Sequence, residues 1–104
     1  MSTYHRKANQ VKIDLETYLK HTAPNLNLAI EDTNQLSRCG WILWLVKSPL
    51  EDHLGIQILS DNSGVFVGFV DLELGYTPRF EPLKTMADLD ALKREIDGKI
   101  SKIL

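Results

Sequence analysis

The chain is poor in cysteine and has no long apolar run. Cys39 is the only cysteine among 104 residues, so no disulfide can form within one chain, and we do not expect a cysteine-based zinc site within one chain. The unbroken apolar run at 41–46 falls far short of the roughly 20 residues that span a bilayer. Residues 1–10 are polar and basic and lack the apolar core of a secretory signal. We therefore expect a cytoplasmic protein with no membrane segment.

An excess of basic charge is also absent. The chain has 12 basic and 14 acidic side chains, a net charge of -2, so it has no global positive field to attract nucleic acid or an anionic membrane. The basic residues near the N-terminus, among them Arg6, Lys7 and Lys12, are too few to change this expectation. Acidic residues concentrate between 31 and 81, and we predict that nucleic acid is not a partner.

Catalytic and cofactor motifs are missing as well. The sequence contains no phosphate-binding glycine loop, no H-E-x-x-H and no G-x-S-x-G. Residues 51–53 place two carboxylates beside an imidazole, but neighbours in a turn rarely reach the geometry of a general base. Cys39 could pair with His21 or His53, yet nothing near it marks an activated thiol. The histidines have no metal-ligand spacing, so we predict no metal, no cofactor and no catalytic residue.

The apolar run at 41–46 is the stretch around which the chain is organised. It does not alternate, because Trp41, Leu43 and Leu45 would point one way while the residues between them point the other. Both faces of this strand therefore need cover, which is typical of a central strand in a sheet. Gly40 before the run and Pro49 after it leave too little length for a helix.

The segments around this strand predict an α+β domain. Residues 26–31, 54–59 and 65–70 alternate between apolar and polar or small side chains, which indicates strands, and the short links at 48–53 and 61–64 make neighbours antiparallel. Apolar stripes at helical spacing predict helices over 9–21 and 89–103. We expect one domain over 1–104, with helix, four-stranded antiparallel meander and helix in the order α-β-β-β-β-α.

The ends of these elements give finer expectations. Residues 1–7 should be frayed, because the apolar stripe begins only at Val11. Thr85, three residues before Asp88, resembles the capping box that starts a helix. Gly75, Pro78 and Pro82 predict an irregular segment at 75–83 that crosses back between the sheet and the last helix.

Polar side chains gather where the fourth strand ends. Asp71, Glu73, Tyr76 and Arg79 combine two carboxylates, a hydroxyl and a guanidinium, which could bind a polar small molecule at a pocket mouth. The competing interpretation is a surface ion-pair cluster that contributes little to stability. A small-molecule binder or small enzyme with its site here is our alternative hypothesis.

The main functional hypothesis comes from the size of the sheet. Two helices can cover one face of four strands, and if both lie there, the second face is a partly apolar patch of the kind that binds partners. If the helices lie on opposite faces, this excess disappears. We expect a non-enzymatic protein-binding or accessory protein that acts through a sheet face, with a homodimer as its simplest form. The candidate partner-binding residues are Trp41, Trp44, Gln57 and Phe66.

Overall fold

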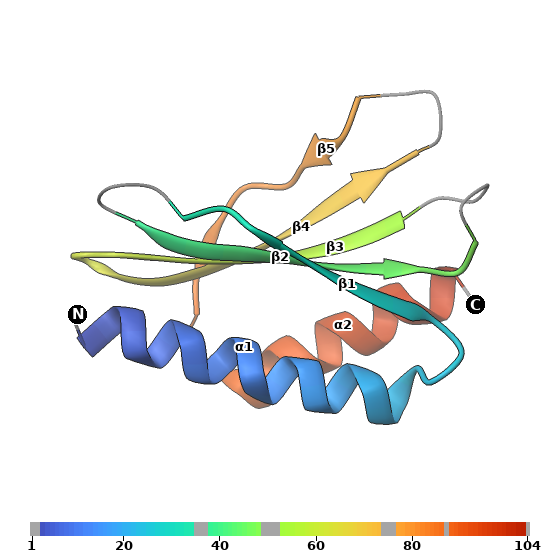
Figure 1. Cartoon of the computed structure of the whole chain (residues 1–104), viewed down its shortest axis with the longest axis horizontal. Helices are drawn as coiled ribbons and strands as arrows, with labels where there is room; N and C mark the ends of the chain where they lie inside the picture. Colours follow the sequence, from blue (N-terminus) through green and yellow to red (C-terminus); the bar gives the residue numbers. More distant parts are fainter. Residues whose placement is uncertain (1–2, 35–37, 49–52, 74–76, 87, 104) are drawn as a thin grey trace.

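The computed structural model describes residues 3–34, 38–48, 53–73, 77–86 and 88–103. The elements, in chain order, are α1 (Thr3–Thr22), β1 (Asn27–Asp32), β2 (Cys39–Val46), β3 (His53–Asp61), β4 (Gly64–Leu72), β5 (Arg79–Phe80), β6 (Lys84–Thr85) and α2 (Leu89–Ile103). The predicted α+β fold is confirmed: in chain order, an N-terminal helix is followed by an antiparallel meander of β1 to β4 and then by a C-terminal helix (Figure 1).

The strands of the meander pair in sequence order, and β2 lies inside the sheet between β1 and β3. A two-residue turn at 62–63 joins β3 to β4, with Asp61 opposite Gly64. One Asp61 carboxylate oxygen accepts hydrogen bonds from the backbone N–H and the hydroxyl of Ser63, at 2.7 and 2.6 Å. These bonds favour the ionised carboxylate, so they lower the pKa of Asp61. The turn signal at 61–64 thus has a direct physical basis.

The segment after β4 contains two short strands that the sequence did not indicate. Phe80 of β5 lies opposite Val70, and Thr85 of β6 lies opposite Phe66, so both strands pair with β4. Between them the register advances by one residue, which is the geometry of a β-bulge. Glu81 within the bulge still donates its backbone N–H to the Phe69 carbonyl at 2.8 Å. The expectation of an irregular segment therefore applies only between these paired residues.

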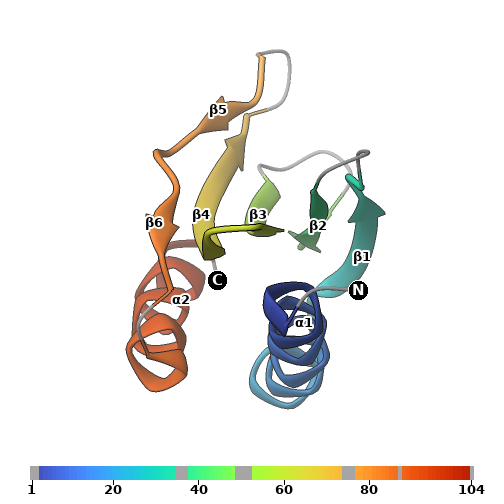
Figure 2. The same cartoon turned by 90° about the vertical axis from the view of Figure 1, so that its left-hand side faces the viewer.

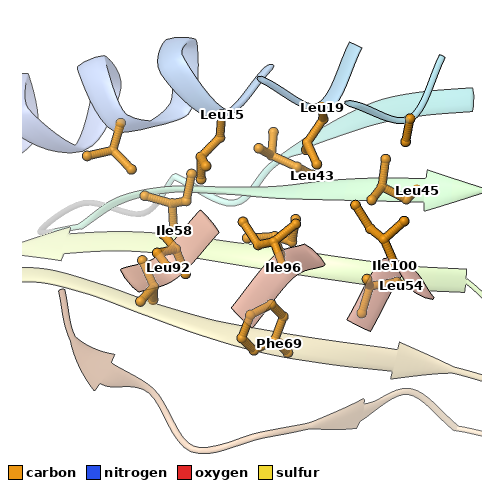
Figure 3. Close-up of a cluster of buried hydrophobic side chains, with 14 of the residues drawn as sticks. Leu15, Leu19, Leu43, Leu45, Leu54, Ile58, Phe69, Leu92, Ile96 and Ile100 are labelled. Carbon is orange, nitrogen blue, oxygen red and sulfur yellow. The ribbon is translucent and has the colours of Figure 1, made fainter. Parts of the chain in front are cut away.

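Both helices pack against the same face of the sheet (Figures 1 and 2). Their buried residues repeat at the predicted spacing, with Leu15 and Leu19 from α1 and Leu92, Ile96 and Ile100 from α2. The sheet contributes alternate side chains from each interior strand to this core (Figure 3), and these are Leu43, Leu45, Leu54, Ile56, Ile58, Val65, Val67 and Phe69. Of the two arrangements that the sequence left open, the chain adopts the one that leaves a face without helices.

Helix α2 begins at Leu89 as predicted, whereas the start of α1 and the capping residue of α2 differ from the prediction. Helix α1 starts at Thr3 and thus includes residues 3–7, where we expected fraying. The buried Ala8 and a hydrogen-bond contact of 2.6 Å between His5 Nδ1 and Ser60 Oγ hold this first part on the sheet. The cap assigned to Thr85 is wrong, because Thr85 lies in β6. Asp88 caps α2 instead, and its side chain accepts the backbone N–H of Asp90 at 3.0 Å.

Polar contacts join α2 to its two neighbours. The Tyr18 hydroxyl of α1 donates a hydrogen bond to Asp97, and Lys93 lies 5.0 Å from the centre of the Tyr18 ring. The hydrogen bond to Asp97 raises the pKa of Tyr18, because it stabilises the protonated hydroxyl. On its other side, Lys99 forms a 2.9 Å ion pair with Glu81 of the bulge. These contacts are at least partly exposed and add little to the stability that the apolar stripe gives to α2.

The packing of β2 can be tested by shortening its buried side chains. Leu43→Ala and Leu45→Ala each remove a fully buried side chain from between the helices and the sheet. Each should lower the free energy of unfolding by about 2–5 kcal/mol in urea denaturation. Ile13→Ala, at an exposed position of α1, is the control and should change it by about 0.5 kcal/mol or less. Midpoints that barely move for both leucine variants would contradict the placement of β2.

The docking of α2 can be tested with a buried charge. Ile96 is fully buried at the middle of the α2 stripe, so Ile96→Asp places an unpaired carboxylate in the core. We expect the domain to unfold or α2 to leave the sheet. Native circular dichroism together with unchanged amide protection over 89–103 would show that α2 does not depend on this contact.

Candidate functional site: the open face of the sheet

The face of the sheet opposite the helices is the largest candidate site, and we call it the open face. Strand alternation assigns its residues, because their neighbours in each strand belong to the core. They are Asn27, Ala29 and Glu31 of β1, Ile42, Trp44 and Val46 of β2, Gly55, Gln57 and Leu59 of β3, and Phe66, Gly68 and Val70 of β4. Within the described part of the chain, no helix lies on this side of the sheet (Figure 2).

The centre of the open face carries no charge. On β2, on β4 and in the middle of β3 its side chains are apolar apart from Gln57, and its acidic residue Glu31 lies on the edge strand β1, opposite Ile42. Sheet faces that remain in water usually carry charged and polar residues at such positions. The centre of this face therefore differs in composition from a typical solvated sheet surface.

Side chains of the open face partly cover one another. Gly55 lies opposite both Trp44 and Val70. A Cβ atom at Gly55 would lie 2.8 Å from the Trp44 ring and 3.0 Å from an Ile42 methyl carbon, so the indole occupies the space above the glycine. This layer explains why Ile42 is 3% exposed and Val70 0% exposed on a face with no helix. Trp44 itself remains only half-buried.

Two exposed apolar side chains extend the open face past β4. Phe80 lies opposite Val70, and residues opposite each other in a sheet point to the same side. A Cβ atom at Gly68 would lie 3.0 Å from Leu83 Cδ2, which places Leu83 on the same side. Phe80 is 56% exposed and Leu83 is 39% exposed. Sequence patterns do not give the direction of either side chain, because it follows only from the pairing of the 79–85 segment with β4.

Three of the four predicted partner-binding residues lie together. Trp44, Gln57 and Phe66 are on the open face, as strand alternation places them. Trp41 is on the helix-covered face, where it packs against the core and where Lys12 Nζ lies 5.4 Å from the ring centre. Positions 41 and 44 differ by an odd number, so the two tryptophans of one strand must point to opposite sides.

The predicted ligand-binding residues form a separate, polar hollow. Asp71, Glu73 and Arg79 line it together with Thr77, and its volume is about 260 Å³. Asp71 lies directly opposite Arg79 across the β4–β5 pair. Tyr76, the fourth predicted residue, falls outside the described residues. The hollow presents charges of both signs, which is an arrangement suited to a small polar molecule and not to an apolar one.

The remaining candidate pairs are not supported by their positions. Cys39 lies opposite Ser60, whereas His53 lies opposite Val46, so seven strand positions, or about 23 Å, separate Cys39 from the level of His53. His21 is in the last turn of α1, which packs near Leu45 at that same far end. Glu51 and Asp52 lie outside the described residues. In the part of the chain that the structure describes, no group of three potential metal ligands occurs.

Comparison with models of protein families, with curated proteins and with solved structures found no match for the chain. Neither described helix combines the length and hydropathy that crossing a membrane requires.

The position of the Trp44 ring can be tested at Gly55. Gly55→Ala adds a methyl group where the indole lies, so the ring must move. We expect a changed near-ultraviolet circular dichroism spectrum and a loss of about 1–3 kcal/mol in the free energy of unfolding. Gly64→Ala is the matched control, because its Cβ would have no heavy atom nearer than 3.9 Å. Equal spectra and stabilities for both variants would refute the packing of Trp44 over Gly55.

Proposed function

We propose that this chain is a non-enzymatic protein-binding protein that acts through the open face of its sheet, and that its partner is a second copy of itself. The observation that carries the proposal is a helix-free sheet face with an uncharged centre, bordered by the exposed side chains of Phe80 and Leu83. Such a face loses its contact with water only when another surface covers it.

The area of the open face is of the size that a dimer needs. The strands β2 to β4 have eight or nine residues, and the β5–β6 segment adds a fifth row beside β1 to β4. At about 3.3 Å per residue and about 4.8 Å between strands, the face covers roughly 700 Å². Standard protein interfaces bury about 800 Å² on each partner, so one copy of this face provides nearly all of that area.

The chemistry of the face favours a second copy over a foreign partner. In a two-fold interface each residue meets the same surface of its partner, so any charge on the face would meet like charge near the axis. The interior strands β2 to β4 have no charged open-face residue between their ends, and Glu31 lies on the edge strand β1, so two like charges need not meet near the axis. Its aromatic side chains, Trp44 and Phe66, with Phe80 at the border, are of the type that contributes most to interface energy.

The polar hollow at Asp71, Glu73 and Arg79 supports a second candidate function, the binding of a small polar molecule. This function is supported because three of the four ligand-binding residues predicted from the sequence line the same hollow. The open face is nevertheless the stronger candidate, because the hollow has a polar surface that water can solvate. Arg79→Ala would impair ligand binding at the hollow and leave dimerisation through the open face intact.

Sedimentation equilibrium across the micromolar range tests the proposed dimer. The wild-type chain should sediment as a dimer that dissociates on dilution. Phe80→Lys places a charge at the border of the open face, where the side chain is already 56% exposed, so the monomer should remain folded. The dissociation constant should rise by about tenfold or more.

Ile13→Lys is the matched control, because Ile13 is 44% exposed on the side of α1 that points away from the sheet. It introduces the same charge at a distance from the open face and should leave the dimer unchanged. A wild-type chain that is monomeric at every concentration would overturn the proposal. So would equal weakening of the dimer by both lysine variants.

A further inference from the structure

The two edges of the sheet differ in how they are protected. At one edge, the β5–β6 segment has a bulge, Pro82 and the basic residues Arg79 and Lys84, all of which hinder the addition of another strand. At the other edge, all six residues of β1 pair with β2 on one side only. Within its bounds β1 has no proline, no lysine and no bulge. The backbone groups on its outer side are therefore available to an added strand, as far as the described strands are concerned.

A hollow of about 230 Å³ lies beside the start of β1. It lies between the last turn of α1 and the first residues of the strand, two segments that are neighbours in Figure 1. Its apolar lining includes Leu19, Leu26, Leu28 and Leu45, and Lys20 stands among them. A strand added to β1 would have alternate side chains on this side of the sheet, within reach of the hollow.

The side chains of β1 that face the helix layer change in character along the strand. Leu28 lines the hollow, and Ile30, opposite the core residue Leu43, is 44% exposed. Asp32 follows at the end of the strand, beside Glu31, and both are exposed. An antiparallel partner would meet these positions in reverse order, first the carboxylate, then Ile30, then Leu28 and the hollow.

We infer that β1 accepts an extended segment of another protein as an additional antiparallel strand, and that this segment has the pattern basic–x–apolar–x–apolar. The basic side chain lies opposite Asp32, the first apolar side chain packs on Ile30, and the second enters the hollow beside Leu28. Main-chain hydrogen bonds hold the segment, and the hollow and the Asp32 carboxylate select its side chains. The β1 side chains that recognise the segment lie on the helix-covered side of the sheet, away from the open face.

A designed peptide provides the test. The probe is acetyl-Thr-Lys-Thr-Val-Thr-Leu-Thr-amide, which has the inferred pattern on a strand-forming background. Its control has the same composition with adjacent key residues, acetyl-Thr-Thr-Lys-Val-Leu-Thr-Thr-amide. In an NMR titration the probe should bind saturably and shift the amide signals of 27–32, and the control should bind at least about tenfold more weakly. Absence of saturable binding, or equal binding of the two peptides, would overturn the inference.

Variants of the protein distinguish specific binding of the probe along β1 from nonspecific binding. Ile30→Lys should abolish measurable binding of the probe, whereas Ile13→Lys, at an equally exposed isoleucine on α1, should not affect it. Circular dichroism checks that both variants are folded. Equal loss of binding in the two variants would show that the peptide does not bind along β1.

A separate variant tests the contact between the lysine of the probe and Asp32. Asp32 accepts the backbone N–H of Asn34 at 2.8 Å, and Asp32→Asn keeps an oxygen there while it removes the charge. It should weaken the lysine probe several-fold at low salt and leave a glutamine-for-lysine probe unaffected. Equal effects on both probes would contradict the assigned direction of the added strand. Neither Ile30→Lys nor Asp32→Asn should change sedimentation, so failure here is distinguishable from failure of the dimer.

Discussion

The fold depends on two apolar helix stripes that share one face of one sheet. Ile56 and Ile58, in the middle strand, are fully buried beneath this layer, with Leu15 of α1 and Ile96 of α2 in the same core. Because both helices cover this side of the sheet, the apolar side chains of the other face can be shielded from water within the chain only by one another. The Trp44 ring, which lies over Gly55, provides part of this shielding. The side chains of Phe80 and Leu83 remain in contact with water.

The faces of the strands could be predicted from the sequence, because alternation depends only on the backbone. Leu43 and Leu45 were placed on one side and Trp44 on the other before any tertiary contact was known. The side on which each helix packs could not be predicted in this way, since both stripes fit either face. That choice depends on how the chain enters and leaves the sheet. The grouping of Trp41 with Trp44 as partner-binding residues failed to use the alternation that separates them.

The weaknesses of the sequence prediction lie where pairing decides the structure. Strands β5 and β6 have two residues each, which is too short for any periodic pattern, and only their contacts with β4 define them. The same pairing draws Thr85 into the sheet and leaves the helix cap to Asp88. For this reason the direction of the Phe80 and Leu83 side chains could not be predicted from the sequence. The polar group at 71–79 was found, because its residues are close in sequence and a strand end brings them together.

The central proposal is that the open face becomes an interface between two copies, and side-chain footprinting with hydroxyl radicals tests it most directly. The labelling of Trp44, Phe66, Phe80 and Leu83 would be compared between dilute and concentrated protein, with the exposed Tyr4 and Ile13 as internal references. We expect protection of the open-face residues to increase with concentration while the two references stay constant. Labelling of Phe80 and Leu83 that does not depend on concentration would contradict the proposal.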